Sequence, residues 1–294
     1  MSMDTHGYRP IHAPGGRLGL TVLGSGGPFL TPRRASSCYV VWLDGQPRLL
    51  LDAGSGAFVR AGQAGLNLAA LETVLLTHTH IDHTGGLAGL VFAAYMQGRT
   101  TLLSVVGPSG RDGQPGCRRF VDLLFGEDGA WSYLQTFEGF GIDASEAPSP
   151  LPGEPTVVLQ RGDLTVRSVA TPHGMMPAVA YRIDDGGASL VYSGDVSGRA
   201  PGFVELARGC DVLLHDQAVP ERDVRESHLH TKPSVTAGIA RDAGCRTLVL
   251  THIMPYLDGE LDDVVATVRE TYHGEVVVAE DVMTIPVSRD AASY

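Results

Sequence analysis

The sequence predicts a layered α/β fold. Units of two strands followed by a helix recur in both halves of the 294-residue chain. In addition, several residues of the types that bind metals come directly after predicted strands, and in a layered α/β sheet such strand ends meet at one edge. The length of the chain and its 43% content of hydrophobic residues are sufficient for a sizeable buried core.

The composition narrows the classes of function. The formal net charge of −11 argues against nucleic acid as a partner, because phosphate contacts require clustered Lys and Arg. The four cysteines contain no Cys-x-x-Cys pair, which favours buried free thiols in a reducing compartment. The first residues lack the apolar core of a signal peptide, and no run reaches the ~18 apolar residues that span a bilayer. We therefore expect a soluble cytoplasmic protein with no membrane partner, for which a homodimer is a compatible assembly.

Two kinds of pattern place the elements in order along the chain. Short apolar runs bounded by turn residues predict strands at 18–23, 38–43, 48–51, 73–76, 101–106, 156–159, 164–170, 179–183, 188–192, 212–214, 247–250 and 276–278. Apolar residues at helical spacing predict helices at 66–71, 87–97, 120–125, 131–140, 203–207, 233–243 and 262–272. The second and third strands are expected to form a hairpin around Asp44-Gly45.

Three segments fall outside this pattern. Residues 1–16, which contain two prolines and a Gly-Gly pair, are expected to form a flexible arm. The glycine-rich loop 24–28 either cradles a phosphate or makes a tight turn, and the turn is favoured because the loop lacks the Lys-Ser/Thr of a P-loop. Residues 109–155 end in a Pro-rich stretch and are expected to be an insert. Its aromatic residues form a lid over a pocket or, as the favoured alternative, pack in the ordinary way.

The most informative stretch is Thr77-His78-Thr79-His80-Ile81-Asp82-His83-Thr84-Gly85-Gly86. It places three imidazoles and a carboxylate within six residues, directly after an apolar run that predicts a buried strand. Imidazole is the commonest metal ligand in proteins, and loops at strand ends usually carry the chemistry of a rigid scaffold. The alternative is an exposed His-rich turn with no role. The specific spacing and the residues that follow favour a metal site.

Further candidate ligands lie past later strands. An isolated histidine such as His173 or His252 more often caps a turn or is buried for structural reasons. The cluster at residues 78–83 makes a role as metal ligands the favoured interpretation for both. Together the chain supplies five imidazoles and two carboxylates, namely His78, His80, Asp82, His83, His173, Asp195 and His252. This inventory suits two metal ions that share a bridging group, and Asp195 is the natural bridge because a carboxylate has two oxygens. Asp52, at the end of another strand, either caps the next turn or steadies the ligand loop from behind.

These motifs resemble the signature of the metallo-β-lactamase fold superfamily. The later motifs occur in the same order: Thr171-Pro172-His173-Gly174, Tyr192-Ser193-Gly194-Asp195 and Leu250-Thr251-His252. The resemblance covers roughly residues 17–287. It implies one hydrolase domain, residues 17–294, folded as a four-layer αββα sandwich of two similar halves. It also implies two metal sites that share Asp195, one formed by His78, His80 and His173, the other by Asp82, His83 and His252.

Other motifs are similar to those of the ribonuclease Z-like and arylsulfatase-like branch of that superfamily. They are Leu23-Gly24-Ser25-Gly26-Gly27-Pro28, Asp211-Val212-Leu213-Leu214-His215-Asp216 and His230-Thr231-Lys232-Pro233. The resemblance implies that His230 is a catalytic histidine that binds no metal, oriented by Asp216. His228 is an alternative two positions away, but only His230 keeps the expected distance to the last ligand motif. The remaining alternative is that His230 belongs to a surface loop.

Two departures limit what the resemblance implies. Ribonuclease Z carries a long basic arm, in most forms between the third ligand motif and the bridging Asp, whereas a compact hairpin joins His173 to Asp195 here. Lys232 also replaces the usual Thr or Ser. These departures and the acidic composition disfavour tRNA processing. We therefore expect a dinuclear hydrolase of a small-molecule ester, above all a phosphodiester, with ribonuclease Z-type RNA cleavage, arylsulfatase and lactonase activities as alternatives.

The expected mechanism uses a metal-bridging hydroxide. Two divalent ions, zinc in the first place and Mn²⁺ or Fe²⁺ as alternatives, would lower the pKa of a shared water toward ~7. Asp82 would orient the hydroxide, and His230, held by Asp216, would protonate the leaving oxygen. A di-iron oxidoreductase is a less favoured alternative, because the ligand motif has no Glu and the chain has no flavin domain.

Overall fold

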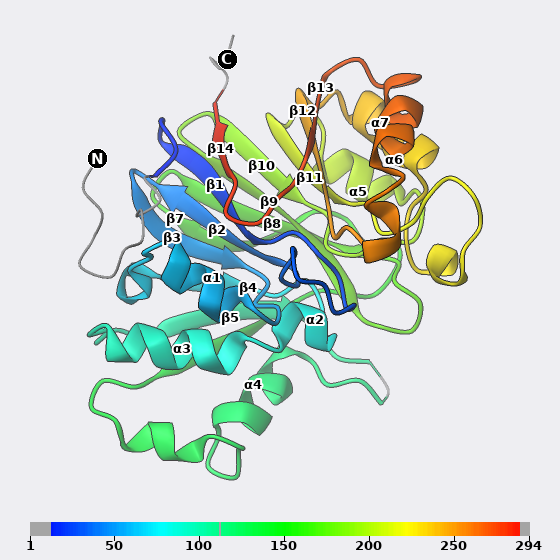
Figure 1. Ribbon diagram of the computed structural model, residues 1–294. Helices are drawn as coiled ribbons and strands as arrows, with labels where there is room; N and C mark the ends of the chain where they lie inside the picture. Colours follow the sequence, from blue (N-terminus) through cyan, green and yellow to red (C-terminus); the bar gives the residue numbers. More distant parts are fainter. Residues whose placement is uncertain (1–12, 112, 289–294) are drawn as a thin grey trace.

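Two sheets of seven strands each form the centre of the molecule (Figure 1). The structure is a computed structural model that describes residues 13–111 and 113–288. Residues 1–12 of the expected arm at 1–16 therefore lie outside the described residues. Among these residues, no helix combines the length and the apolar character needed to cross a membrane.

The first sheet has the strand order β14-β1-β2-β3-β4-β5-β6. Its strands are β1 (Leu18–Gly24), β2 (Cys38–Leu43), β3 (Gln46–Leu51), β4 (Thr73–Leu75), β5 (Leu103–Pro108), β6 (Ile142–Ala147) and β14 (Thr284–Val287). Strands β3 to β6 are parallel to one another, and the other neighbouring pairs are antiparallel. The last strand of the described chain thus pairs with the first.

The second sheet has the order β13-β12-β11-β10-β9-β8-β7. Its strands are β7 (Thr156–Arg161), β8 (Leu164–Thr171), β9 (Ala178–Asp185), β10 (Ala188–Tyr192), β11 (Val212–Asp216), β12 (Thr247–Thr251) and β13 (Glu275–Val278). Strands β10 to β13 are parallel, and β7 to β10 are antiparallel neighbours. As expected, only the compact hairpin β9–β10 lies between His173 and Asp195.

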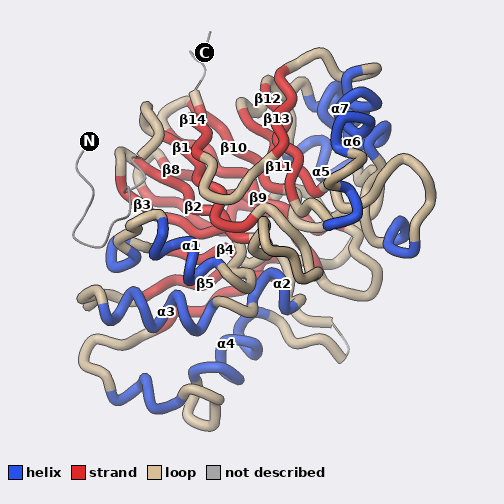
Figure 2. Tube along the Cα trace, viewed as in Figure 1, coloured by secondary structure: helices blue, strands red, loops and turns tan. Residues whose placement is uncertain are grey.

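Helices cover the outer faces of both sheets (Figure 2). The helices on these faces are α1 (Ala57–Gln63), α3 (Leu87–Met96), α4 (Cys117–Phe125), α5 (Pro201–Leu206), α6 (Pro233–Ala243) and α7 (Leu261–Arg269). The short helix α2 (Ile81–Thr84) follows β4. Short 3₁₀ helices lie at Leu68–Ala70, Ser132–Thr136, Arg225–His228 and Pro255–Leu257.

Three apolar layers hold these elements together. The central layer lies between the sheets and includes Leu20 and Val41 from the first sheet and Tyr181 and Leu214 from the second. A second layer packs α1, α3 and α4 against the first sheet, and a third packs α5, α6 and α7 against the other. The fold is therefore the αββα sandwich of the metallo-β-lactamase type that the motifs implied.

Several elements differ from the sequence-based expectation. Helices α1 and α2 and strands β6 and β14 were not expected. The helices expected at 66–71 and 131–140 are only the 3₁₀ helices Leu68–Ala70 and Ser132–Thr136. Strand β6 has no apolar alternation, because it is the edge strand of its sheet and only one of its residues is fully buried. Its pairing with β5 places part of the segment 109–155 within the first sheet. The role of the rest of that segment as a lid stays a prediction.

Candidate metal centre

The candidate ligands meet at the ends of strands from both sheets. The loop after β4 and helix α2 supply His78, His80, Asp82 and His83; His173 follows β8, Asp195 follows β10, and His252 follows β12. Strands β8, β10, β11 and β12 run in the same direction, so their carboxyl ends lie at one edge of the second sheet. The structure thus brings together all seven residues that the sequence suggested as ligands.

One group consists of three imidazoles. His80 Nδ1 lies 3.0 Å from His78 Nε2 and 3.3 Å from His173 Nε2. His78 and His173 are buried, and these ring nitrogens point to a common position that could hold a metal ion. This is the first of the two ligand sets that the family resemblance implied.

A second group contains one carboxylate and two imidazoles. Asp82 Oδ2 lies 3.6 Å from His83 Nε2 and 3.3 Å from His252 Nε2, and all three side chains are buried. Their ligand atoms are also close enough to hold one ion. This is the second implied set.

Asp195 lies between the two groups and directs one oxygen toward each. Its Oδ2 is 3.9 Å from His78 Nε2 and 3.6 Å from His173 Nε2. Its Oδ1 is 3.3 Å from His83 Nε2 and 3.4 Å from His252 Nε2. A carboxylate in this position can bind one cation through each oxygen, as a bridge between two metals requires.

The protein holds the outward Nδ1 nitrogens of two of these rings. His83 Nδ1 lies 2.7 Å from Asp52 Oδ2, and His173 Nδ1 lies 3.1 Å from the Leu229 carbonyl oxygen. When Nδ1 carries the proton in such a bond, the Nε2 lone pair is directed inward, as metal-binding histidines require. His83 Nε2 and Asp195 Oδ1 are buried without a hydrogen-bond partner within the described residues. A metal ion satisfies such atoms, and the donor set therefore fits two divalent cations.

The electrostatics of the site favours the metal-binding protonation state in three of the histidines and in both carboxylates. His83 differs: burial alone would lower its pKa, but Asp195, Asp52 and Asp82 raise it well above its ordinary value. Burial lowers the pKa of His78, His80 and His173, which keeps these rings neutral. Burial alone would raise the pKa of Asp82, but the neighbouring His83 and His252 lower it to about 2. The pKa of Asp195 is likewise well below its usual range, because the same histidines outweigh the effect of burial. Both carboxylates are therefore ionised at neutral pH.

Asp52 anchors the ligand loop from behind. Its Oδ1 accepts a hydrogen bond from Thr77 N (2.7 Å). Its Oδ2 accepts hydrogen bonds from Thr77 Oγ1 and the Tyr192 hydroxyl, both 2.8 Å long, and also contacts His83. Asp52 also has a positive φ of 55°, a conformation that its surroundings must enforce. The sequence left the role of Asp52 open, and it did not single out Tyr192. The position of Tyr192 at the end of β10, beside Asp195, was the available signal.

Two glycines allow the close packing of the site. A Cβ atom on Gly27 would lie 2.6 Å from Cε1 of His252, so the glycine-rich loop can contact this ring only without a side chain. Gly194 has a positive φ of 57°, and a Cβ there would clash with Thr77. The loop 24–28 thus packs closely against a candidate ligand. Within it the structure shows no turn, and Gly26 instead forms single β-bridges with Ser36 and Ile253, so the tight turn favoured by the sequence is not observed.

His230 also reaches the site. Its Nδ1 lies 2.9 Å from Asp216 Oδ2, and both side chains are buried. Burial alone would lower the pKa of His230, but the hydrogen bond with Asp216 and the charge of Asp195 raise it above its ordinary value. His228 is exposed and bonds the Arg225 carbonyl oxygen instead. His230 is therefore the better candidate for catalysis.

The position of His230 leaves one alternative role. His230, Asp195 and His252 place ligand atoms within 4.8 Å of one another, so this trio could also hold a cation. Asp216 holds Nδ1 of His230 in the same way as Asp52 holds Nδ1 of the candidate ligand His83. Such a pairing suits a metal ligand as well as a general acid. The role of His230 as an acid that binds no metal therefore stays a prediction that the family resemblance carries.

A cavity opens beside the candidate ligands. Its volume is about 480 Å³, and Asp82 lines one part of it. This volume lies within the range of about 300–1,000 Å³ typical of small-molecule sites. Among the candidate ligands, Asp82 is the one that lines this cavity, so the cavity borders the candidate metal centre at this residue.

Comparison with known proteins agrees with this geometry. The sequence model of a beta-lactamase superfamily domain matches residues 47–253. A curated relative, ribonuclease Z of Mycobacterium avium, is 30% identical over 287 residues, which cover 91% of this chain and 98% of the relative. The range 47–253 that the family model matches contains the positions of all seven candidate ligands, Asp52, Asp216 and His230.

Solved structures show the same fold. The metallo-beta-lactamase fold protein YhfI from Bacillus subtilis has a TM-score of 0.71 and 24% identity, covering 91% of this chain and 98% of that protein. Human tRNase Z, short form, has a TM-score of 0.74 and 22% identity, covering 92% of this chain and 99% of that protein. At these identities the likeness concerns the fold alone.

Proposed function

The chain belongs to the metallo-β-lactamase superfamily, in its ribonuclease Z-like branch of metal-dependent hydrolases, and we propose that it hydrolyses phosphodiester bonds in RNA. The observation that carries the proposal is the position of Asp195, which directs one oxygen to each of two ligand groups beside the His230–Asp216 pair. Such a site suits cleavage of a phosphodiester, in which charge develops on phosphoryl oxygens.

The proposed metal ligands are those described above. His78, His80 and His173 would hold one ion, Asp82, His83 and His252 the other, and Asp195 would bridge them. Two bound divalent cations supply a water of lowered pKa and positive charge that stabilises the phosphoryl oxygens in the transition state. Zinc is the proposed metal, because imidazole nitrogens with few carboxylates suit it.

The remaining chemistry belongs to the side chains of this chain. Water attacks phosphorus, the bond from phosphorus to the leaving oxygen breaks, and that oxygen needs a proton. His230 supplies it: Asp216 holds Nδ1, which leaves Nε2 free to donate. The raised pKa of His230 increases the fraction of the ring that carries this proton. Asp82 can accept a hydrogen bond from the attacking water and orient it.

RNA is proposed as the first substrate because of the relatives. The Mycobacterium avium protein, named ribonuclease Z, matches over nearly its whole length. This finding favours the ribonuclease Z alternative over the small ester that the sequence analysis expected. It also weakens the expectation that nucleic acid is not a partner.

A small phosphodiester is the second candidate, and two observations favour it. The connection between His173 and Asp195 is the hairpin β9–β10, with only Gly186 and Gly187 between its strands. The net charge of −11 also gives little general attraction for a polyanion. A short substrate needs neither an arm nor a basic surface.

One experiment tests both candidates. Protein loaded with zinc or manganese is incubated with a tRNA precursor that carries a 3′ extension and, separately, with bis(4-nitrophenyl) phosphate. Cleavage of the precursor at a single position supports the RNA proposal. Hydrolysis of the chromogenic ester alone supports the small substrate. Hydrolysis of neither, with two metals bound per chain, would contradict both.

A further inference from the structure

Four of the exposed large apolar side chains gather in the cavity beside Asp82. The exposed fraction is 102% for Leu30, 76% for Ile81, 60% for Val59 and 46% for Phe29. Isolated exposed apolar residues need no explanation, but a group of them around one cavity next to a catalytic centre indicates a ligand. They come from three separate segments: the loop after β1, helix α1 and the start of α2.

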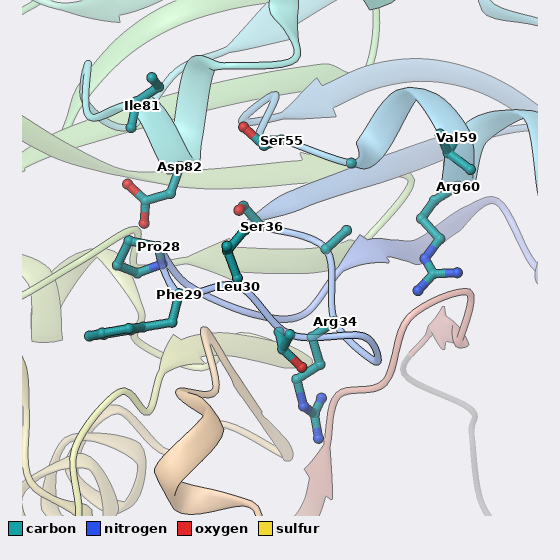
Figure 3. Close-up of a pocket in the computed structure, with 13 residues that line it drawn as sticks. Pro28, Phe29, Leu30, Arg34, Ser36, Ser55, Val59, Arg60, Ile81 and Asp82 are labelled. Carbon is teal, nitrogen blue, oxygen red and sulfur yellow. The ribbon is translucent and has the colours of Figure 1, made fainter.

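One end of the cavity lies at Asp82, and the other is lined by Arg34 and Arg60, whose guanidinium groups pair with Asp258 and Asp281, respectively. Figure 3 shows Ile81 and Asp82 at one end, Val59, Arg60 and Arg34 toward the other, and Leu30 between them. A group that enters this cavity from the metal centre would therefore pass along apolar walls and reach guanidinium groups. Hydroxyl groups from Thr31, Ser36 and Ser55 also line it.

The walls are held in place. Asp281, just before β14, accepts hydrogen bonds from Ser25 N (3.0 Å) and Ala35 N (2.7 Å), so it ties both ends of the loop that carries Phe29 and Leu30. The same carboxylate binds Arg60 Nε at 2.8 Å. The cavity is thus preformed, which reduces the entropy that a ligand must lose on binding.

The phenyl ring of Phe29, which forms one wall of the cavity, also has a packing partner. Phe29 contacts Tyr256 edge to face, with ring centroids 6.4 Å apart and an interplanar angle of 76°. Half of the Phe29 side chain stays exposed. A fixed, half-exposed phenyl ring is a typical surface for stacking of an unpaired base.

We propose that this cavity binds the nucleoside that stays attached to the phosphate after hydrolysis. A base can stack on the apolar walls, and its polar edge can bond the hydroxyl groups. The next phosphate can approach the partly exposed Arg60, whereas Arg34 is almost buried and bonds Asp258, Ser25 and the Ala279 carbonyl oxygen. An aliphatic ester would use the walls but not the hydroxyl groups. His230, which protonates the departing oxygen, does not line the cavity, so the departing group lies elsewhere. The inference rests on the proposed phosphodiesterase function.

The test compares substrates that share one leaving group. The 4-nitrophenyl esters of thymidine 5′-phosphate and thymidine 3′-phosphate are compared with methyl 4-nitrophenyl phosphate, which has no nucleoside. We expect kcat/KM to be at least about tenfold higher for one thymidine ester than for the methyl ester, because base stacking and apolar burial add to binding.

Three variants locate the origin of this preference. Leu30→Ser and Val59→Ser remove apolar surface from the cavity without adding charge, and we expect each to reduce the preference about threefold or more. Leu102→Ser is the matched control, because Leu102 is 67% exposed and precedes β5 at the strand end opposite the metal centre. It should leave the preference unchanged.

The outcomes separate this inference from the proposed function. Equal kcat/KM for all esters, or a preference that Leu30→Ser and Val59→Ser leave intact, would overturn the nucleoside site while the phosphodiesterase stands. Hydrolysis of no ester, together with no cleavage of the tRNA precursor, would overturn the proposed function. In that case calorimetric titration with thymidine monophosphate decides: binding weakened by Leu30→Ser supports the cavity as a nucleotide site, and absence of binding refutes it.

Discussion

The inner wall and the mouth of the candidate metal centre are built in opposite ways. On the inner wall, Asp52, Thr77 and Tyr192 are almost completely buried and joined by short hydrogen bonds. At the mouth, Leu30 and Val59 are largely exposed and form no part of the core. The inner wall is suited to fixing the metal ligands whatever the substrate is. The mouth is suited to selecting the substrate, which is where members of one fold family usually differ.

This division has a consequence for mutagenesis. Changes on the inner wall should alter metal binding, and changes at the mouth should alter substrate preference. The predictions below follow this division from the largest expected effect to the smallest.

Replacement of Asp195 by Ala should have the largest effect. It removes the carboxylate between the two ligand groups, so we expect loss of at least one metal per chain and of detectable hydrolysis. Metal analysis by mass spectrometry and hydrolysis of bis(4-nitrophenyl) phosphate measure the two effects. A thermal unfolding curve shows whether the variant is folded. A folded Asp195→Ala protein with two metals and full activity would refute the bridging role.

His230→Ala should lower turnover while the metal content stays near that of the unchanged protein. Loss of a positioned general acid typically lowers the rate by about 10²–10⁴-fold. The effect should shrink for a leaving group that needs no proton, such as 4-nitrophenolate, and stay large for an alkoxide. Loss of metal from this variant would instead assign His230 as a ligand, which the trio with Asp195 and His252 would then explain.

Asp52→Asn should weaken metal binding about 10–100-fold, because an amide offers only one acceptor oxygen to the donors that now share the carboxylate. Competition with a zinc-binding dye measures the affinity. Restoring the metal concentration should restore most of the turnover. If turnover stayed low at saturating metal, Asp52 would have a role beyond positioning His83.

Tyr192→Phe should have the smallest effect. It removes one hydrogen bond to Asp52 and leaves the others in place, so we expect a loss of about 0.5–1.5 kcal/mol in the free energy of unfolding and a few-fold weaker metal binding. Urea titration and the same dye assay measure these values. A change in substrate preference without a change in metal affinity would break the distinction between inner wall and mouth.

The sequence predicted the inner parts of the site much better than the mouth. Three imidazoles and a carboxylate within His78–His83 make a pattern that sequence spacing can reveal, and the later ligands follow strands with clear apolar runs. By contrast, the mouth combines Leu30, Val59 and Ile81, which come from three segments and carry no shared pattern. Their proximity results only from the packing of α1 and the first loop, so no periodicity could indicate it.

The same reasoning explains which elements of the fold escaped prediction. Strand β6 is polar and β14 contains Pro286, so both lack the signals by which strands are identified. They form because neighbouring strands offer unpaired edges. Tyr192 was missed for a related reason: its hydroxyl becomes important only when β10 lies beside the end of β3, where Asp52 is found.

Because β14 pairs with β1, the first sheet can be completed only after the second sheet has been synthesised. Leu18 pairs with Val287, so the first strand keeps an open edge until the last one has left the ribosome. The final candidate ligand, His252, emerges earlier than Asp281, which ties the loop of the mouth. A nascent chain that ends between these two residues would therefore contain every metal ligand while its substrate cavity is still unformed. We expect the growing chain to become able to bind metal before it becomes able to recognise a substrate.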